Sequence, residues 1–491
     1  MKNKPKEPPR IAVKFANTVF VLGILYSILL VVYAIYKIYN PPEHVSPAFY
    51  IISILSCGVF ATLFGFGLKR LSNNLKVNLS ILFFTIGITV YGFETYLEFS
   101  KKTQREIIAK QMGVPYDTRT KMEVLDDLRD SGVEAYPNIH PYVLLGDITT
   151  KNGLSTRDGM IFPLSGISNK LMVQSNENGY WMMYTGDKYG FHNSNDVYQD
   201  NIVDILITGD SFAEGWSVKS EENIGGVLQE IGFNVVNIGK SGNGPLLEFA
   251  ALKEYAEPLK PKIVLWVYFV NDFINLVDEM KSSILQMYLN EDDYSQNLIS
   301  RQEEIDAVLI NYVQVLWEKN KEKERVENNT NWTTNINEVI INKIINNRII
   351  RILKLNKLRR MINLRPTPPT PTPIFRNILQ KSNQMVSDWD GKMYFVYLPA
   401  FERYSIDNED PNRNFVMRTA TELDIPIIDI HEEVFDSHPD PLSLFPWMML
   451  KKSLMLFRLY GHYTTEGYRL VAEAIGRRLE ADGYVPIKSK K

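Results

Sequence analysis

The sequence predicts an α/β domain with a parallel sheet, preceded by three transmembrane helices. Two observations support this prediction. Three long apolar runs lie within the first hundred residues, and short apolar strands alternate with helical segments from about residue 202 onward. With 491 residues the chain is too long for one ordinary core, so more than one structural unit is expected.

The N-terminal part of the chain is predicted to be a membrane anchor over residues 1–98. Its apolar runs cover residues 15–36, 47–68 and 77–93. A bilayer core of about 30 Å takes about 20 apolar residues in a helix, which the first two runs supply. The third run is shorter and is followed by Glu94, which would lie near an interface. Buried core helices are the alternative for each run, and the first is too long for the apolar region of a signal peptide.

Positive charge sets the expected orientation of this anchor. Lys and Arg residues gather between residues 2 and 14 and again between the second and third runs. Such residues favour the cytoplasmic side, so the N-terminus is expected there. Everything after about residue 100 would then face the periplasm or the cell surface. The basic residues at 101–105 oppose this arrangement, and without insertion of the third run the large domain would be cytoplasmic.

Composition excludes several function classes. The formal net charge of -3 offers no basic excess, so nucleic-acid binding is not expected. The single cysteine, Cys57, lies in the second apolar run and leaves no intramolecular disulfide or cysteine metal cluster. The His and carboxylate residues lack metal-ligand spacing, so neither a metal nor an organic cofactor is expected.

Five apolar segments are predicted to form the strands of the sheet. They are continuous runs of Val, Ile and aromatic residues, typical of parallel strands covered on both faces. A helix between the first two begins with Glu221 and Glu222 and ends before Gly232. The predicted strands lie within residues 204–211, 233–242, 262–272, 392–400 and 425–430.

Two other segments are less regular. Residues 99–200 are predicted to be a connecting segment of short strands and loops, packed on the following domain. Residues 275–390 are predicted to be a helical insertion with a charged part, an Asn-rich part, a basic amphipathic part at 348–364 and a polyproline-like run at 366–373. A solvated helical insertion, packed beside the sheet or near the membrane, is favoured over a lid or a membrane-surface helix.

Polar motifs follow the first two strands. Gly209-Asp210-Ser211 ends the first, and a serine at the carboxyl tip of a parallel strand lies where α/β sheets bind ligands. The loop at 237–244 follows the second, and its glycines can turn a backbone N–H toward an oxyanion. A surface turn and a plain strand-to-helix loop are the alternatives.

Two further motifs occur later in the chain. Asn271-Asp272 ends the third strand, where a side-chain amide can donate to a developing oxyanion. Capping of the next helix is the alternative. Gly461-His462 precedes an amphipathic helix and can present an imidazole to the same strand tips, although a capping or core histidine is also compatible with this position.

The order of these Ser, Gly, Asn and His residues resembles that of the SGNH, or GDSL-like, hydrolase family. The resemblance implies a flavodoxin-like three-layer domain over residues 201–491. It implies that Ser211 is the nucleophile and His462 the base. Gly242 and Asn271 would be oxyanion donors, together with the backbone N–H of Ser211.

Two positions depart from the family pattern. Phe269 stands where the third block usually has Gly. Leu459 stands where an Asp usually lies three residues before the His, so the acid that would orient the imidazole is missing there. Asp440, Asp436 and Asp429 are the candidate replacements, although Asp429 is also expected to end a strand. A Ser–His dyad is the remaining possibility.

The resemblance implies a membrane-anchored serine acyl-esterase or O-acyltransferase. By analogy with membrane-tethered members, the expected substrate is an acyl ester, chiefly acetyl, of a cell-surface glycan. A lipid ester is not distinguished from it. The alternative is a catalytically impaired module that binds glycan or assists polysaccharide assembly. Besides its substrate, the chain is expected to contact the lipid bilayer, and membrane partner proteins are left open. The aromatic residues proposed for glycan stacking are Trp181, Tyr184, Tyr189 and Phe191.

Overall fold

The computed structural model divides into two compact units, and each is described by itself. The first unit contains the N-terminal helices together with residues 331–369 and 456–458, and the second contains the rest of the chain from residue 104 onward. The residues that the structure describes are 7–39, 47–99, 104–146, 149–157, 159–199, 202–328, 351–361, 373–405, 409–446 and 461–486.

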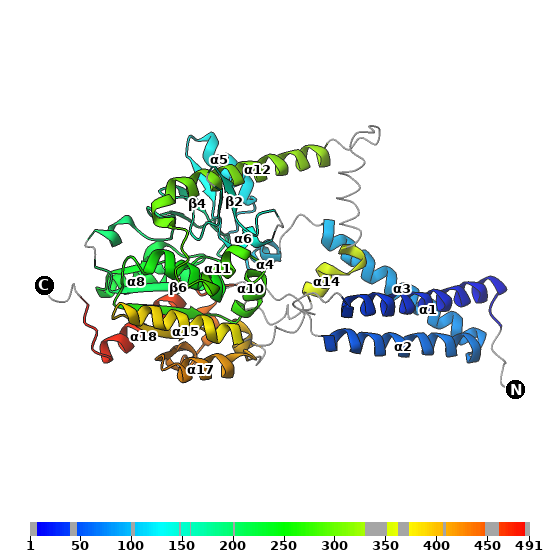
Figure 1. Cartoon of the computed structure of the whole chain (residues 1–491). Coiled ribbons are helices and arrows are strands. Elements are labelled where there is room, and N and C mark those ends of the chain that lie inside the picture. Colours follow the sequence, from blue (N-terminus) through cyan, green and yellow to red (C-terminus); the bar gives the residue numbers. More distant parts are fainter. Residues whose placement is uncertain are drawn as a thin grey trace. The chain divides into compact units, whose positions relative to one another are not determined.

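The first unit is built on three apolar helices, which are visible in Figure 1: α1 (Arg10–Tyr39), α2 (Pro47–Arg70) and α3 (Asn73–Phe99). Each is long and apolar enough to span a membrane, as predicted. The α1 helix packs against both of the others. The rings of Phe20 and Phe64 meet edge to face with centroids 5.6 Å apart, and the Ser80 hydroxyl donates to the Ala16 carbonyl at 3.3 Å.

A segment from the second half of the chain also belongs to this unit. Helix α14 (Asn356–Met361) packs against α3, which lies more than 250 residues earlier. The buried carboxylate of Glu94 accepts the backbone N–H groups of Lys357 and Leu358 at 2.8 and 2.7 Å. Two main-chain donors thus stabilise an acidic side chain within an apolar helix, where an unpaired carboxylate would be costly.

This contact involves part of the predicted insertion at 275–390. Part of its basic stretch is held by the third apolar helix, since the Arg351 guanidinium also donates to Glu98 at 2.8 Å. The insertion is therefore divided between the two units. A lid or membrane-surface role stays a prediction. Most of the Asn-rich stretch, and the run at 366–373 apart from its last residue, lie outside the described residues.

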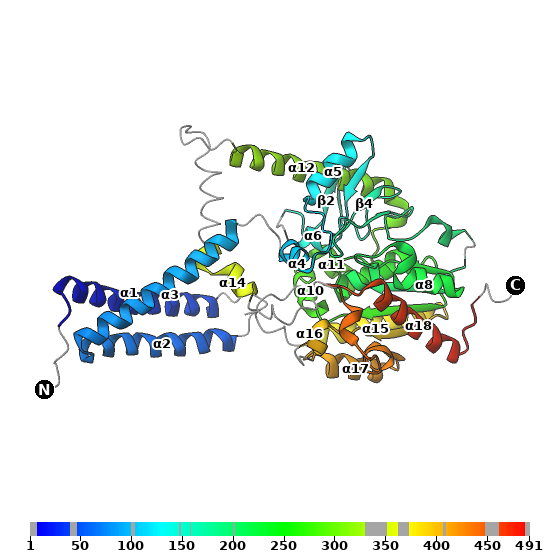
Figure 2. The same cartoon turned by 180° about the vertical axis from the view of Figure 1, so that it is seen from behind.

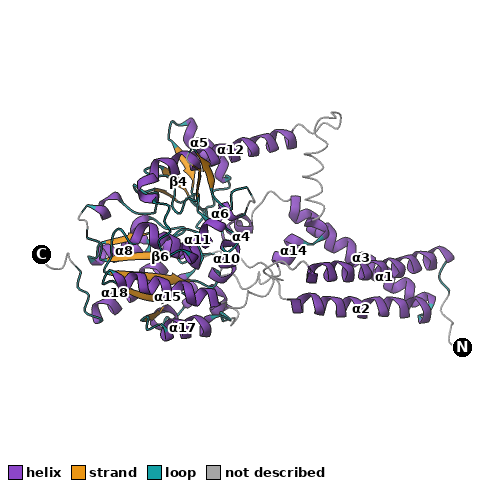
Figure 3. Cartoon of the chain, in the orientation of Figure 1, coloured by secondary structure: helices purple, strands orange, loops and turns teal. Residues whose placement is uncertain are grey.

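The second unit is built on a five-stranded parallel sheet, which Figure 3 shows in orange. The strand order is β10-β9-β8-β6-β7, and every neighbouring pair is parallel. Each strand falls within one of the five predicted segments, which confirms the α/β fold class. The strands are β6 (Ile205–Gly209), β7 (Val235–Asn237), β8 (Ile263–Tyr268), β9 (Lys392–Tyr397) and β10 (Ile427–Asp429).

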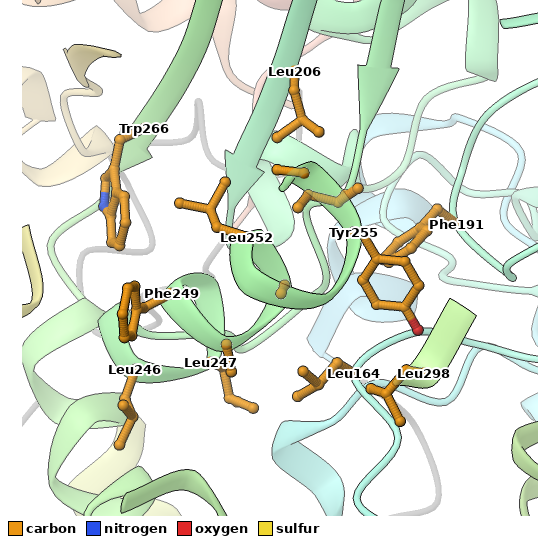
Figure 4. Close-up of a cluster of buried hydrophobic side chains, with 14 of the residues drawn as sticks. Leu164, Phe191, Leu206, Leu246, Leu247, Phe249, Leu252, Tyr255, Trp266 and Leu298 are labelled. Atoms are coloured by element: carbon orange, nitrogen blue, oxygen red, sulfur yellow. The ribbon is translucent and has the colours of Figure 1, made fainter. Parts of the chain in front are cut away.

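Helices cover both faces of the sheet and form two separate hydrophobic cores. In β8, Val264 and Trp266 enter one core while Ile263 and Leu265 enter the other, because successive side chains point to opposite faces. Figure 4 shows part of the first core, with Leu206 and Trp266 above Leu246, Leu247 and Phe249. The first core includes α9 (Pro245–Ala251), α10 (Asp272–Glu279), α11 (Ser283–Asn290), α12 (Gln302–Asn328), α15 (Pro373–Asp388) and α17 (Arg413–Glu422), and the second includes α8 (Ile224–Ile231) and α18 (Thr465–Ala481).

The segment before the sheet is folded and packs on it. Its residues Tyr136, Phe162 and Phe191 are buried in the first core. Short strands and loops form here as predicted, and Figure 2 shows them around α4 and α6 beside the sheet. The elements are α4 (Gln104–Met112), α5 (Lys121–Asp130), α6 (Tyr142–Leu145), a sheet of β1 (Ala135–Pro137), β4 (Leu171–Val173) and β5 (Met183–Thr185), and a hairpin of β2 (Leu154–Thr156) and β3 (Gly159–Ile161).

Candidate active site

Ser211 follows the carboxyl end of β6, an inner strand of the sheet that lies between β8 and β7. The strand ends at Gly209, whose φ of +151° suits glycine, and a Cβ there would lie 2.7 Å from the Val267 carbonyl oxygen. Asp210 then caps the one-turn helix α7 (Ser211–Glu214) by accepting the Phe212 N–H at 2.8 Å. This sharp turn places the Ser211 hydroxyl at the tip of the strand, with 8% of the residue exposed.

His462 reaches this hydroxyl from the segment before α18. Its Nε2 lies 2.7 Å from Ser211 Oγ, although the two residues are separated by 251 positions in the chain. Thr464 caps α18 by accepting the Gly467 N–H, which fixes the start of that helix at Thr465, three residues after His462. Such a distance suits proton transfer from the hydroxyl to the imidazole.

Glu177 supplies the carboxylate that the sequence left unassigned. Its Oε2 lies 3.1 Å from His462 Nδ1 and accepts the backbone N–H of the same histidine at 3.1 Å. Its Oε1 accepts from the Arg105 guanidinium at 3.0 Å. With Nδ1–H donated to Glu177, Nε2 is left to accept the Ser211 proton. Ser211, His462 and Glu177 thus form one hydrogen-bonded chain.

Glu177 is ionised within this chain at any pH near neutral. Burial by itself would raise its pKa, because it disfavours the charged form. The charge and hydrogen bonds of His462, with the charge of Arg105, outweigh burial and lower the pKa to about 2. The carboxylate can therefore stabilise an imidazolium when His462 takes up a proton.

The candidate acids named from the sequence lie elsewhere, and this prediction is corrected. Asp429 ends β10, where its carboxylate accepts from the Arg413 guanidinium and from the His431 backbone N–H. Asp440 is exposed and precedes a short 3₁₀ turn. Neither bonds to the imidazole. In the family pattern the acid lies in the segment just before the His, whereas Glu177 lies in the connecting segment, 285 residues before His462. No motif around Glu177 marks it in the sequence.

The two predicted oxyanion donors lie in the loops on either side of the β6 tip. Gly242 follows β7 and Asn271 follows β8, and these two strands flank β6 in the sheet. Gly242 has a φ of +74°, and a Cβ there would lie 3.0 Å from Tyr142 Cβ, so glycine is required. The Asn271 amide hydrogen-bonds the Asp210 carboxyl, next to Ser211. Parallel topology therefore brings both donors beside the nucleophile, and their role in catalysis stays a prediction.

Aromatic rings surround the imidazole. Phe212 lies 4.6 Å from the His462 ring centroid and packs against Phe269 at 4.0 Å. Phe269, the residue that replaces the usual Gly, thus fills space next to Phe212. The partly exposed Trp216 follows α7 by two residues, and its ring centroid lies 5.8 Å from that of His462.

The predicted aromatic glycan surface does not form as one patch. Tyr184 and Phe191 are buried, whereas Trp181 and Tyr189 are partly exposed. Tyr184 instead donates its hydroxyl to the buried Glu214 and Asn138. Within the described ranges, no group of three or more His, Cys, Asp or Glu side chains is arranged to hold a metal ion.

A buried ion pair ties the nucleophile helix to the Gly242 loop. Glu214, at the end of α7, accepts from the Lys240 ammonium at 3.0 Å, and both side chains are 0% exposed. Its second oxygen accepts the Ser241 N–H at 2.8 Å, one residue before Gly242. Burial by itself would raise the pKa of Glu214, but the charge of Lys240 and the hydrogen bonds from Asn138 and Lys240 together outweigh burial and lower the pKa. One carboxylate therefore fixes the loop relative to Ser211.

Two buried carboxyl groups close to the site have no such partner. Glu248 and Asp272 are both 0% exposed. Neither oxygen of Glu248, nor Oδ1 of Asp272, has a hydrogen-bond partner among the described residues. Burial, followed by the charges of neighbouring carboxylates, raises both pKa values well above their usual range. Both groups are therefore shifted toward the protonated form in the folded chain.

Glu248→Gln is expected to stabilise the chain at neutral and higher pH. Unfolded glutamate ionises near pH 4.5, whereas the folded group keeps its proton. The stability of the wild-type chain therefore falls as pH rises above 4.5, by about 1.4 kcal/mol per pH unit for each proton taken up on folding. Urea unfolding at pH 5 and pH 8 would show a larger gain at pH 8. Equal gains at both pH values would contradict the raised pKa of Glu248, and the exposed Glu230→Gln serves as control.

Comparisons with known proteins add a distant structural likeness. No family model matches the chain, and no curated protein matches it. Among solved structures, the chain is similar to a putative lipolytic protein of the G-D-S-L family from Desulfitobacterium hafniense DCB-2, with 14% identity and a TM-score of 0.30. It is also similar to TesA, with 11% identity and a TM-score of 0.29. Both likenesses cover 56% of this chain and 98% of the other. At these TM-scores they carry no argument about function, which therefore rests on the site itself.

Proposed function

We propose that the chain is a membrane-anchored serine acyl-esterase or O-acyltransferase. The observation that carries this proposal is the hydrogen-bonded chain from Ser211 through His462 to Glu177. A buried hydroxyl, an imidazole and an ionised carboxylate in that order are the groups that activate a serine nucleophile. A structural serine and a capping histidine would not require the carboxylate on the far side of the ring.

The chemistry follows from these groups. His462 Nε2 takes the Ser211 proton as Oγ attacks the acyl carbonyl carbon. The carbonyl oxygen becomes an oxyanion, held by the backbone N–H groups of Ser211 and Gly242 and by the Asn271 amide. The intermediate collapses, the imidazolium gives its proton to the departing alkoxide, and an acyl-serine remains. A second nucleophile then reverses these steps: water gives an acid and makes the chain an esterase, whereas a sugar hydroxyl gives a new ester and makes it an acyltransferase.

The substrate is proposed to be an acyl ester, chiefly acetyl, of a cell-surface glycan. Support for this comes from the three membrane-capable helices and from the positive charge at their N-terminal side. In the proposed orientation the N-terminus lies in the cytoplasm and the Ser211 unit outside it, where surface glycans are found. The family resemblance adds the acyl chemistry by analogy.

Active-site labelling tests the proposal. The full-length chain in detergent is expected to react with a fluorophosphonate probe and to cleave p-nitrophenyl acetate. Ser211→Ala is expected to abolish both, because it removes the attacking oxygen. Ser283→Ala, on α11, is the matched control and should keep both. Labelling and cleavage that survive in Ser211→Ala would overturn the assignment.

A further inference from the structure

Lys121 is a cationic side chain that the proposed chemistry does not use. It begins α5, and its side chain is only partly exposed. Its ammonium lies 5.9 Å from the Trp181 ring centroid. Within the described part of the chain, the Lys121 ammonium forms no hydrogen bond or ion pair. Burial lowers its pKa to about 8, and the charge of Glu214 opposes this only in part.

The start of α5 is fastened to the loop that carries Glu177. The Asp117 N–H donates to the Gly179 carbonyl at 2.7 Å, and the Asn176 side-chain amide donates to the Asp117 carbonyl at 2.7 Å. Asp117, which makes both bonds, lies four residues before Lys121, and its two partners lie on either side of Glu177 in the sequence. The backbone therefore places Lys121 beside the segment that orients the catalytic imidazole.

Side chains also connect Lys121 with His462. Burial lowers the pKa of His140 to about 4, and the charges of Lys240 and Lys121 add to this lowering. His140 is therefore neutral at pH 7. The His140 ring lies 6.3 Å from Trp216, and Trp216 lies 5.8 Å from His462. The Trp216 and His140 rings therefore follow one another away from the imidazole, and the Lys121 charge acts on His140, the second of these rings.

Burying part of an ammonium that has neither a hydrogen bond nor a counter-ion is costly, and such a group is a candidate for binding a ligand. Glu214, the carboxylate whose charge acts on Lys121, already accepts from Lys240 and three further donors. An anionic group on the substrate would provide the missing counter-charge. The partly exposed rings of Trp181 and Trp216 can pack on the apolar face of a sugar, with the polar edges left for hydrogen bonding.

We propose that Lys121 binds a carboxylate of the glycan, so that the ester substrate is an acylated acidic sugar. This inference rests on the proposed function and narrows its substrate class. Trp216 and Trp181 line the sugar between the reacting ester, at Ser211, and the carboxylate, at Lys121.

The test compares two acetylated oligosaccharides, one of glucuronate and one of glucose, with p-nitrophenyl acetate as a small neutral ester. For the full-length wild-type chain, kcat/KM for deacetylation or transfer is expected to be at least ten times higher on the glucuronate ester. Lys121→Gln is expected to lose that preference while keeping its rate on glucose ester and p-nitrophenyl acetate within about twofold. Lys121→Arg should restore the preference, and 0.5 M NaCl should reduce it in the wild type but not in Lys121→Gln.

Lys319→Gln, an exposed lysine on α12, is the matched control and should change nothing. Equal rates of the wild type on the two oligosaccharides would overturn the inference. So would an equal loss on all three esters in Lys121→Gln, because that result indicates a structural role. Ser211-dependent cleavage of p-nitrophenyl acetate distinguishes failure of this inference from failure of the proposed function. If that cleavage persists but the wild type shows no preference for the glucuronate ester, only the acidic substrate is wrong. If that cleavage is absent, the proposed function fails as well.

Discussion

Glu177→Gln is expected to lower kcat for ester cleavage by about 10³- to 10⁴-fold, as loss of the orienting carboxylate does in other serine triads. The neutral amide can offer its NH₂ to the ring, which favours the tautomer with the proton on Nε2. His462 would then face Ser211 with a donor instead of an acceptor. Rates with p-nitrophenyl acetate measure the change in kcat, and KM is expected to move much less because Glu177 does not touch the ester.

The same substitution is expected to change acid stability. The pKa of Glu177 lies at about 2 in the folded chain, against 4.5 for an ordinary glutamate. Its ionised form therefore contributes stability that is fully present above pH 4.5 and is lost as pH falls through about 2. The Glu177→Gln variant should therefore lose less folding stability than the wild type as pH falls. Glu230→Gln, at an exposed glutamate, is the control for both the kcat and the stability measurements. A Glu177→Gln variant that keeps more than a tenth of the wild-type kcat would show that a Ser–His dyad suffices.

Lys240→Met is expected to destabilise the second unit by about 3–5 kcal/mol, since removing one partner of a buried ion pair leaves an uncompensated charge. Here that charge is Glu214, which is 0% exposed. Glu214→Gln should cost a similar amount because Lys240 then lacks its counter-ion. The double variant Glu214→Gln/Lys240→Met should be less destabilised than the sum of the single variants, because neither charge is left buried alone.

Urea unfolding of the four proteins gives this double-mutant cycle. Activity provides a second readout, since Glu214 also holds the Ser241 N–H beside Gly242. Loss of that bond should lower kcat more than it raises KM, as expected for an oxyanion donor that matters in the transition state. Lys262→Met, whose ammonium is half-exposed beside Asp204, is the matched control and should cost about 1 kcal/mol or less. A Lys240→Met cost in that range would contradict the role of the pair.

The location of Glu177 also bears on the alternative of a catalytically impaired module. That alternative depended on Leu459, which stands where an acid was expected before His462. The structure places another carboxylate on the imidazole, so the missing acid no longer argues for loss of catalysis. The connecting segment is then part of the site, since it contributes Glu177 and the Arg105 that pairs with it.

The sequence by itself determined the architecture and most of the site. Apolar strands and helices alternate along the chain, and this local pattern dictates a parallel sheet whose loops gather at one edge. Ser211, Gly242 and Asn271 each follow a strand directly, so their shared location follows from topology. The three apolar helices are likewise a matter of local composition, because about 20 apolar residues suffice to span a bilayer.

Only the tertiary structure decided which distant segments meet. Glu177 reaches His462 across 285 residues, and Glu94 meets the backbone at Lys357 across 263. The sequence around each carboxylate does not distinguish it from a solvent-exposed one. Its partner lies in another element, so no periodicity or residue spacing in the sequence marks the pair. The physical reason is that the spacing of apolar residues along a strand or helix indicates only which side of that one element is buried. Charge pairing is instead settled when elements pack and a buried carboxylate must find whichever donor lies beside it.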